Sequence, residues 1–380
     1  MIICKATECM GCFACKNICP VNAIAVGHDA MDKTIPIIDE NTCLNCGMCR
    51  KVCPVNTQIE YKRADAAYAS WSKMITDKEN SSSGGMAAVF SRKIIEQGGC
   101  VFASAGIDGT VKHKKAITEN ECEQFRGSKY VQSDIGESYK EAKEELDSGK
   151  KVLFVGTPCQ IAGLKSFLQK DYANLVTVDL ICHGTPPVKY LQAHIQSKTG
   201  SSNWDKVSFR GKYDWHLQVI QNGRVEYDEY RDSDLYFQSF LDALTYRDNC
   251  YECKYARPER VSDITIGDFW GLNRSNLENA YDGRISLVLP NTKKGKEFFE
   301  DCQDKLVCEK RPFEEAICPE QWNLQHPSKI HLEREKFEKY YLQFGFDDAV
   351  KRTSIGKSVL KRKIKNKIKC NVLVKMIRKR

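Results

Sequence analysis

Apolar and polar positions in the middle of the chain follow a repeated order of short strand, turn and helix. Residues 151–156 (KVLFVG) form a short apolar run, followed by the turn TPC and the helical pattern QIAGLKSFL. Residues 175–181 (LVTVDLI), the turn CHGTPP and the run VKYLQAHIQSKTG repeat this order. In an open parallel sheet such turns lie at the carboxyl ends of strands, where ligands bind. We therefore expect an α/β domain in which the two turns face one pocket.

A glycine-rich turn before another helical run predicts an anion site. The polar residues 76–83 (TDKENSSS) lead into Gly84, Gly85 and the run MAAVFSRKIIEQGG. Serines of this turn can cap the helix, and its glycines leave backbone N–H groups open to a negatively charged ligand.

The N-terminal segment contains a repeated cysteine motif. The pattern C-x2-C-x2-C-x3-C-P begins at residue 9 and again at residue 43, and the segments VNAIAVG and TIPIID predict the paired short strands of a ferredoxin module. Three cysteines of each repeat surround one 4Fe-4S cluster, and the fourth reaches the other cluster. The predicted ligands are Cys9, Cys12, Cys15 and Cys53 for the first cluster, and Cys43, Cys46, Cys49 and Cys19 for the second. Structural zinc is the alternative, but zinc takes four ligands in two pairs and does not call for two C-P steps.

Four more cysteines stand in or near predicted turns. Cys159 and Cys182 follow the two strands described above, and Cys250 and Cys253 form a separate C-x2-C. Four thiolates from three segments could hold a third 4Fe-4S cluster beside the pocket. The alternative is that they are small buried hydrophobic residues. The remaining cysteines have no pairing that spacing supports, and we treat them as ordinary thiols: Cys4, Cys100, Cys122, Cys302, Cys308, Cys318 and Cys370.

Positive charge is concentrated at the C-terminus. Residues 356–380 contain eleven Lys or Arg and no acid, so the net charge of +8 leaves −3 for the other 355 residues, and nucleic-acid binding gains no support. Within this tail an apolar residue recurs every four positions, at Leu360, Ile364, Ile368, Val372 and Met376. A basic helix with such a stripe could lie on an anionic membrane surface or dock on an acidic partner. The alternative is a solvated terminal helix.

The N-terminus and the length of apolar runs bear on location. The start MIICKATEC lacks the basic and apolar regions of a signal peptide, and no apolar stretch reaches 18 residues. Nineteen cysteines without a secretion signal favour a reducing cytoplasm. We therefore expect a cytoplasmic protein; contact with the inner membrane face through the basic tail is the alternative.

Seven segments, in the family's order, resemble the coenzyme F420 hydrogenase/dehydrogenase beta-subunit family over about residues 65–300. They are SSSGG (81–85), FRGSKYVQS (125–133), VGTPCQIAGLKSFL (155–168), DLICHGTPP (179–187), VSFRGK (207–212), CYECKY (250–255) and DITIGDFWG (263–271). The first 57 residues, in turn, resemble bacterial-type two-cluster ferredoxins, a module that longer family members carry. The resemblance implies an FAD-binding domain that links a two-electron carrier to one-electron iron-sulfur clusters. It also implies the third cluster, because the cysteines at 159, 182, 250 and 253 match family positions.

The resemblance suggests roles for single residues. His183 could stabilise reduced flavin or deliver a proton, and Arg210, Lys212 and Lys129 could hold an anionic substrate. His183 and Lys129 are the candidate catalytic residues. Where many members read FRDK, this chain has Gly211, which removes an acid near that anion site. The residues expected to contact FAD or substrate are Ser83, Gly84, Gly85, Gly127, Ser128, Lys129, Tyr130, Gly156, Thr157, Pro158, Gln160, Arg210 and Lys212. Each has a plainer interpretation as turn chemistry, a solvated charge or a loop hydrogen bond.

These observations predict an α+β ferredoxin-like dicluster module, an α/β flavin-binding domain and a basic helical C-terminal tail. The expected regions are a dicluster domain (1–60), two beta-subunit family regions (65–148 and 149–315), a helical extension (316–355) and the tail (356–380). We expect an iron-sulfur flavoprotein oxidoreductase that moves electrons between a ferredoxin-type donor and a small organic substrate through FAD. One alternative is a coenzyme F420-dependent dehydrogenase, and another is an electron-transfer subunit of a larger complex without its own substrate.

Overall fold

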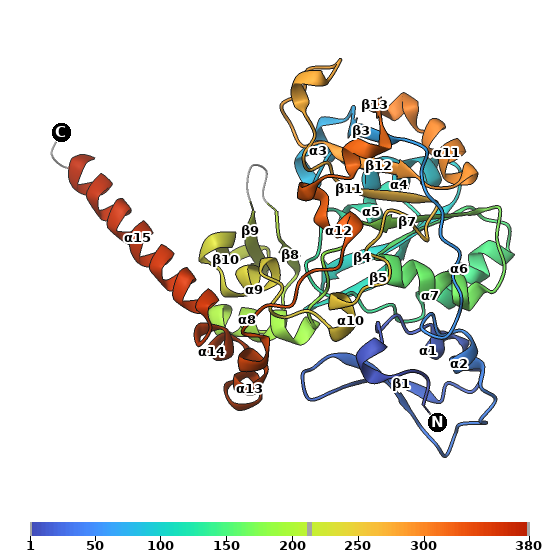
Figure 1. The fold of residues 1–380 in the computed structure, drawn as a ribbon, viewed down its shortest axis with the longest axis horizontal. Coiled ribbons are helices and arrows are strands. Elements are labelled where there is room, and N and C mark those ends of the chain that lie inside the picture. Colours follow the sequence, from blue (N-terminus) through green and yellow to red (C-terminus); the bar gives the residue numbers. More distant parts are fainter. Residues whose placement is uncertain (1, 211–214, 378–380) are drawn as a thin grey trace.

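The computed structural model describes residues 2–210 and 215–377, and side chains up to residue 366 (Figure 1). The strands are β1 (Ile24–His28), β2 (Thr34–Ile38), β3 (Ala67–Ser72), β4 (Cys100–Ile107), β5 (Thr110–Ala116), β6 (Val152–Gly156), β7 (Leu175–Leu180), β8 (Lys206–Ser208), β9 (His216–Gln221), β10 (Arg224–Tyr230), β11 (Ile264–Asp268), β12 (Ser286–Pro290) and β13 (Leu306–Arg311). The helices are α1 (Ala14–Ile18), α2 (Met48–Lys51), α3 (Ile75–Asn80), α4 (Met86–Glu96), α5 (Glu119–Cys122), α6 (Ser138–Asp147), α7 (Pro158–Leu168), α8 (Val188–Thr199), α9 (Leu235–Leu241), α10 (Asp248–Tyr251), α11 (Lys293–Glu300), α12 (Trp322–Gln325), α13 (Arg334–Phe344), α14 (Phe346–Lys351) and α15 (Ser354–Ile377).

The N-terminal module has the predicted paired strands. β1 and β2 are antiparallel, with Ile24 opposite Ile38, and they are followed by the short helix α2. The cysteine loops before α1 and α2 turn through left-handed backbone at Phe13 and Gly47. The small module therefore presents its thiols from loops that two strands hold together.

The rest of the chain is built on one mixed sheet of eleven strands. Their order is β10-β9-β8-β4-β6-β7-β11-β12-β3-β13, and β5 pairs with the edge of β4. Strands β4, β6, β7 and β11 run parallel, whereas β12, β3 and β13 add antiparallel neighbours. Because β3 and β13 belong to the same sheet, the regions expected at 65–148 and 149–315 share one continuous sheet.

Helices cover both faces of this sheet, as strand alternation requires. Val101 and Leu153 point to the face covered by α4 and α11, whereas Phe102 and Phe154 point to the face covered by α6 and α7. The predicted units β6-α7 and β7-α8 and the predicted helix α4 are all confirmed. Helix α3, which begins at Ile75 and overlaps the polar stretch 76–83, was not predicted.

The dicluster module lies against α6 and α7 (Figure 1). Met10, Cys12 and Val52 of the module belong to the same hydrophobic cluster as Phe154 and Ile161 of the large domain. A core that continues from module to domain fixes the position of the cysteine loops relative to the sheet.

The C-terminal helices pack on α8 and α9, except for the end of α15, which extends away from the body of the molecule (Figure 1). Ile355 and Val359 are buried, but Leu360 and Ile364 of the predicted stripe are exposed. The side chains of Ile368, Val372 and Met376 lie outside the described part of the chain. The described helices include none with the length and apolar character that a membrane crossing needs.

Candidate functional site: three groups of cysteines and an adjoining cavity

The structure brings the predicted ligands of the first cluster together. The thiol of Cys15 interacts with those of Cys9 and Cys53, and the thiol of Cys12 interacts with both Cys9 and Cys15. Cys4, treated from sequence as an ordinary thiol, hydrogen-bonds with Cys53 and Cys9. Cys4 and Cys9 are spaced as C-x4-C, which does not occur in the repeated motif. The sequence therefore did not predict that Cys4 lies beside the ligands of the first cluster. Cys9, Cys12, Cys15 and Cys53 thus form a first thiol group.

The predicted ligands of the second cluster line one small cavity of their own: Cys19, Cys43, Cys46 and Cys49. This group lies nearer to solvent than the first. Cys46 is exposed, and the neighbouring side chains of Leu44 and Met48 are also exposed. The second group therefore faces the outside, whereas the first faces the large domain.

A third group forms from Cys159, Cys182, Cys250 and Cys253. The thiol of Cys182 interacts with those of the other three, although the four come from the turns after β6 and β7 and from around α10. Burial raises the pKa of Cys159 to about 12 and also raises the pKa of Cys250 and Cys253. Metal binding would deprotonate such thiols and compensate the buried negative charge.

The thiol groups fit iron-sulfur clusters better than zinc. Among the residues that the structure describes, no three His, Cys, Asp or Glu side chains are placed to share a single metal ion. Four thiolates on one zinc would lie about 4 Å apart, given a Zn–S bond of about 2.3 Å, whereas a 4Fe-4S cubane binds its four thiolates at four separate irons. Sets of four thiols serve both zinc and iron-sulfur clusters, so it is the separation of the thiols that favours the cluster.

Helix α7 brings the first and third groups close together. It begins at Pro158 and carries Cys159 in its first turn; Gly163, one turn later, meets the module. A Cβ atom on Gly163 would lie 3.0 Å from the Sγ atom of Cys12 and 2.9 Å from the hydroxyl of Tyr139. Cys159 and Gly163 lie on one face of the helix about 6 Å apart along its axis. The first and third thiol groups are therefore separated by about one turn of α7.

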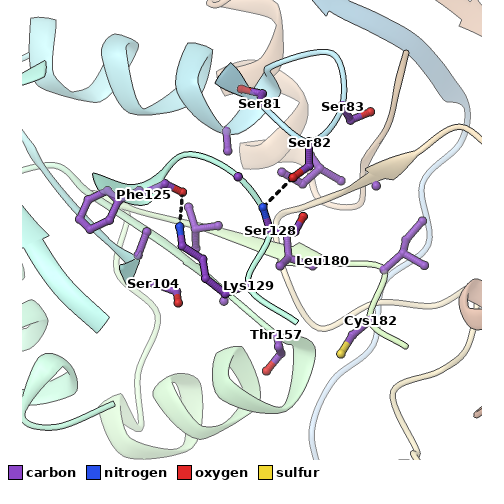
Figure 2. A pocket seen from close by; sticks show the side chains of 18 of the residues that line it. Ser81, Ser82, Ser83, Ser104, Phe125, Ser128, Lys129, Thr157, Leu180 and Cys182 are labelled. Carbon is purple, nitrogen blue, oxygen red and sulfur yellow. Dashed lines mark hydrogen bonds between the residues drawn. The ribbon is translucent and has the colours of Figure 1, made fainter. Parts of the chain in front are cut away.

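A cavity of about 300 Å³ adjoins the third group. Cys159 and Cys182 line it together with Gly156, Thr157 and His183, so the two predicted turns face one pocket. Figure 2 shows Thr157 and Cys182 in its wall, with the serine segment 81–83 and the loop of Ser128 above them. The cavity thus connects a buried thiol group with the glycine-rich segments.

Part of the cavity wall is suited to an anion. Gly85, with φ +90°, precedes α4, whose first residues Met86 and Ala87 also line the cavity. Ser83 and Gly84 are held by β12 and the residue before it, because Ser83 Oγ donates to the carbonyl of Ile285 and the Gly84 N–H donates to Ser286 Oγ at 2.9 Å. Backbone N–H groups at a helix start favour negative charge.

Two arginines beside this anion site are already paired with carboxylates: Arg92 contacts Glu119, and Arg126 contacts Glu123. Arg92 and Arg126 line the cavity, and both contact the carboxylate of Asp77, which is buried in helix α3. Nη1 of Arg126 is buried and has no hydrogen-bond partner among the described residues. An unpaired buried donor is costly, so this atom is suited to donate to a ligand oxygen.

The loop after the anion site is fixed by Lys129. Its ammonium donates to the carbonyl oxygens of Gln124, Phe125 and Arg126, and Figure 2 shows the bond to Phe125. Burial lowers the pKa of Lys129 to about 7. The Ser128 N–H donates to Ser82 Oγ at 2.6 Å. The structure therefore places Lys129 in the support of the loop, with its three hydrogens directed to the backbone.

Arg210 lies at the cavity wall in an ion pair. Its guanidinium contacts Asp268 at 2.7 Å and donates to the hydroxyl of Tyr130 at 2.9 Å. Tyr130 in turn stacks on Phe240, with ring centroids 4.6 Å apart. Asp268, from the end of β11, supplies a carboxylate beside the anion site, although Gly211 replaces the acid of the FRDK pattern. Lys212 lies outside the described residues.

His183 lines the cavity beside Cys182, and burial lowers its pKa. A second histidine, His113, was missed from sequence. Its ring nitrogens contact Ser133 Oγ at 2.9 Å and the carbonyl oxygen of Val155 at 3.0 Å, so it supports the turn that presents Cys159. Burial lowers the pKa of His113 to about 4.

Gln160 caps α7 as predicted. Its side-chain oxygen accepts from the Thr157 N–H at 3.0 Å, completing a capping box at the start of the helix. Its amide nitrogen donates to the carbonyl of Ser133 at 3.0 Å. Gln160 therefore joins the start of α7 to Ser133, the residue that also contacts His113.

Comparison with known proteins agrees with these sites. Residues 149–316 match the family described as the C terminus of the coenzyme F420 hydrogenase/dehydrogenase beta subunit, and residues 8–57 match the 4Fe-4S dicluster domain. The chain is thus similar to a dicluster domain in its first part and to the C terminus of that beta subunit over residues 149–316. The family match covers all four cysteines of the third group, and the dicluster match covers all eight of the first two groups.

The other comparisons add little to this assignment. No curated protein matches the chain. A chain from the F420-reducing NiFe hydrogenase complex of Methanosarcina barkeri, in a xenon-derivatised structure, aligns with a TM-score of 0.42 and 18% identity. That alignment covers 76% of this chain and 91% of the other. The two domain matches therefore carry the assignment as an iron-sulfur electron-transfer protein related to the F420 hydrogenase beta subunit.

Proposed function

We propose that this protein is an iron-sulfur flavoprotein oxidoreductase that moves electrons between its 4Fe-4S clusters and a two-electron organic substrate. The observation that carries the proposal is the convergence of Cys159, Cys182, Cys250 and Cys253 beside a cavity of about 300 Å³. A cluster at this position would lie next to whatever occupies the cavity. The match to the beta-subunit family supports an oxidoreductase role for the same residues.

FAD is the cofactor that we assign to the cavity. Its diphosphate would meet the start of α4 and the unpartnered Nη1 of Arg126. Tyr130 and the turn at Gly156 would offer an aromatic face and a close backbone approach to the isoalloxazine ring. When bound, FAD supplies the conversion between two-electron and one-electron transfer.

The cavity residues would orient the substrate and exclude water. The guanidinium of Arg210 already donates to Asp268, to Tyr130 and to the carbonyl of Ser82, so it would bind a substrate anion by the second N–H of Nη2. His183, exposed at the cavity wall and with a lowered pKa, would be neutral at pH 7 and able to hold a proton near the reacting atoms.

The positions of the thiol groups suggest the order of electron transfer. The second group is the most exposed and would exchange electrons with a ferredoxin-type partner. The first group lies against α7, one helical turn from Cys159 of the third group. Electrons would then pass from the second cluster to the first, from the first to the third, and between the third cluster and the cavity.

Rapid reduction of the protein with a one-electron donor tests this function. Reduced ferredoxin should bleach the iron-sulfur absorption and then the flavin absorption of the wild type. Cys250→Ser should keep the first step and lose at least tenfold in the rate of the second, because the third cluster is removed. Cys302→Ser, at a buried cysteine outside the three groups, is the matched control. Flavin reduction at the wild-type rate in Cys250→Ser would contradict the proposal.

Coenzyme F420 is the second candidate for the two-electron partner, and the family match favours testing it. A visible-absorption assay distinguishes F420 from another organic substrate. If F420 is the partner, reduced F420 will reduce the clusters under anaerobic conditions. No cluster bleaching with F420, but bleaching with another hydride donor, would exclude the coenzyme as substrate.

An electron-transfer subunit of a larger complex is the third interpretation. The exposed Leu360 and Ile364 on the projecting helix α15 favour contact with a partner. Isolation of the native protein tests this interpretation. A stable stoichiometric partner would support a subunit of a larger complex, whereas a single chain with catalytic activity would contradict it.

A further inference from the structure

Arg247 is a buried arginine that lies between the first and third thiol groups. Only 2% of its surface is exposed. Nη2 donates to the carbonyl oxygens of Cys9 and Thr34, both at 3.0 Å, and Nη1 donates to Gln132 Oε1 at 2.9 Å. A Cβ atom on Gly11 would lie 3.2 Å from the Cζ atom of Arg247. The guanidinium is therefore packed against the loop from Cys9 to Cys12.

The backbone of Arg247 is tied to the third group. Its N–H donates to the carbonyl oxygen of Thr185, in the turn that carries Cys182, at 3.2 Å. Its carbonyl oxygen accepts from the N–H of Cys250 at 3.0 Å. Arg247 therefore bonds through its backbone to two segments of the third group and through its side chain to the first group.

The charge of Arg247 has no carboxylate partner. In residues 2–210 and 215–377, its hydrogen-bond partners are carbonyl, hydroxyl and amide oxygens, and its buried Nε has none. Arg260, the other arginine buried to this degree, contacts the carboxylate of Asp179 at 3.2 Å. A buried charge is costly unless an opposite charge offsets it. Thiolates that bind a cluster would supply this negative charge from the cysteines around Arg247.

Arg247 contacts a ligand loop of each group. Its guanidinium donates to the carbonyl oxygen of Cys9 in the first group, and its carbonyl oxygen accepts from the N–H of Cys250 in the third. The positive charge therefore lies between the first and third groups.

We propose that Arg247 is the shared counter-ion of the first and third clusters, and that it raises the reduction potential of both. Net charge and hydrogen bonding around a cluster set its potential, and a fixed cation favours the more negative, reduced form. An electron that passes from one cluster to the other stays beside the same guanidinium. The inference rests on the proposed function, because it requires the third cluster.

Redox titration followed by electron paramagnetic resonance tests this role. Arg247→Gln removes the charge and keeps an amide, whereas Arg247→Lys keeps the charge. At a fixed potential, Arg247→Gln should lower the ratio of reduced to oxidised first and third clusters about tenfold, which is about 59 mV for a one-electron couple. The lysine variant should shift less than threefold. The second cluster should not move in either variant.

The controls assign each signal and exclude a general effect. Loss of a signal in Cys250→Ser identifies the third cluster, and a change in Cys46→Ser identifies the second. Arg311→Gln, which removes a partly buried arginine that pairs with Glu315 and contacts none of the three thiol groups, should leave all three potentials unchanged.

Iron content distinguishes a missing third cluster from a wrong role for Arg247. Fewer than about twelve irons in the wild type would overturn the third cluster and the counter-ion together. Twelve irons with unmoved potentials in Arg247→Gln, or equal shifts in the glutamine and lysine variants, would overturn only the role of Arg247. If Arg247→Gln does not load its clusters, Arg247→Lys decides: a shift below threefold supports the role, and a tenfold fall contradicts it.

Discussion

Single residues decide how closely the dicluster module approaches the large domain. Gly163 leaves room for Cys12 against α7, and Gly11, with φ +60°, leaves room for Gln132 and Arg247. A side chain at either position would push apart two groups of cysteines that lie about one helical turn from each other. If the proposed function holds, electron transfer between the first and third clusters would depend on the absence of side chains at these two glycines.

Gly163→Ala tests this dependence. In a helix without such contacts, alanine would stabilise by about 1 kcal/mol. Here its Cβ would lie at or below 3.0 Å from Cys12 and Tyr139, so we expect the variant to be destabilised by about 1–3 kcal/mol. Thermal unfolding of the cluster-loaded protein measures the change, with Lys165→Ala on the same helix as control. A raised unfolding temperature would show that the module does not pack against Gly163.

The residues that could be predicted from sequence are those whose signal is local. The eight motif cysteines and the cap residue Gln160 belong to short patterns with fixed spacing. Arg247 and His113 could not be predicted, because their roles come from contacts with residues far away in the chain, such as Thr34 and Val155. The same holds for Lys129, whose sequence suggests a substrate contact but whose ammonium is directed to backbone carbonyls.

At the scale of elements, regular periodicity predicted the units that present the third thiol group. β6-α7 and β7-α8 follow directly from short apolar runs, glycine- or proline-rich turns and helical spacing. Helix α3 escaped prediction because its polar sequence is ordered by tertiary contacts, chiefly those of Asp77 with Arg92 and Ser72. Tertiary ion pairs can override the local preference for a turn.

The C-terminal helices are joined by a buried histidine. His194 on α8 contacts Asp234, before α9, at 2.8 Å, and Asp347 on α14 at 2.6 Å. Tyr227 also donates to Asp234, and Lys198 pairs with Asp347. Burial opposes protonation of His194, but the two carboxylates outweigh it and raise its pKa to about 9.

The stability of this helical region should therefore depend on pH through His194. Because its folded pKa lies above the ordinary value of 6.5, its contribution is complete below about pH 6.5 and is lost as the pH rises through about 9. The full contribution is on the order of 3 kcal/mol.

Denaturant unfolding of His194→Gln at pH 6 and pH 9.5 measures this effect. The difference in free energy of unfolding from wild type should be large at pH 6 and small at pH 9.5. Ser197→Ala, which removes a neutral contact with Asp347, should show the same difference at both pH values. A His194→Gln deficit that does not shrink at high pH would contradict protonation of His194.

At the scale of the whole molecule, the chain forms a route from an exposed surface to an internal cavity. The second thiol group faces solvent, the first lies at the seam between module and sheet, and the third adjoins the cavity. Sequence spacing predicted each group but not their order in space, because that order depends on the packing of the module against α7. The position of the module is therefore the feature that turns separate cysteine motifs into one path.

The central claim is that this path ends at a third cluster beside a flavin. The most direct measurement is the iron, sulfide and flavin content of anaerobically purified protein, together with its visible spectrum. The account predicts about twelve irons, about twelve sulfides and one FAD per chain. About eight irons without flavin would contradict it, and would leave a dicluster electron carrier joined to a domain of another function.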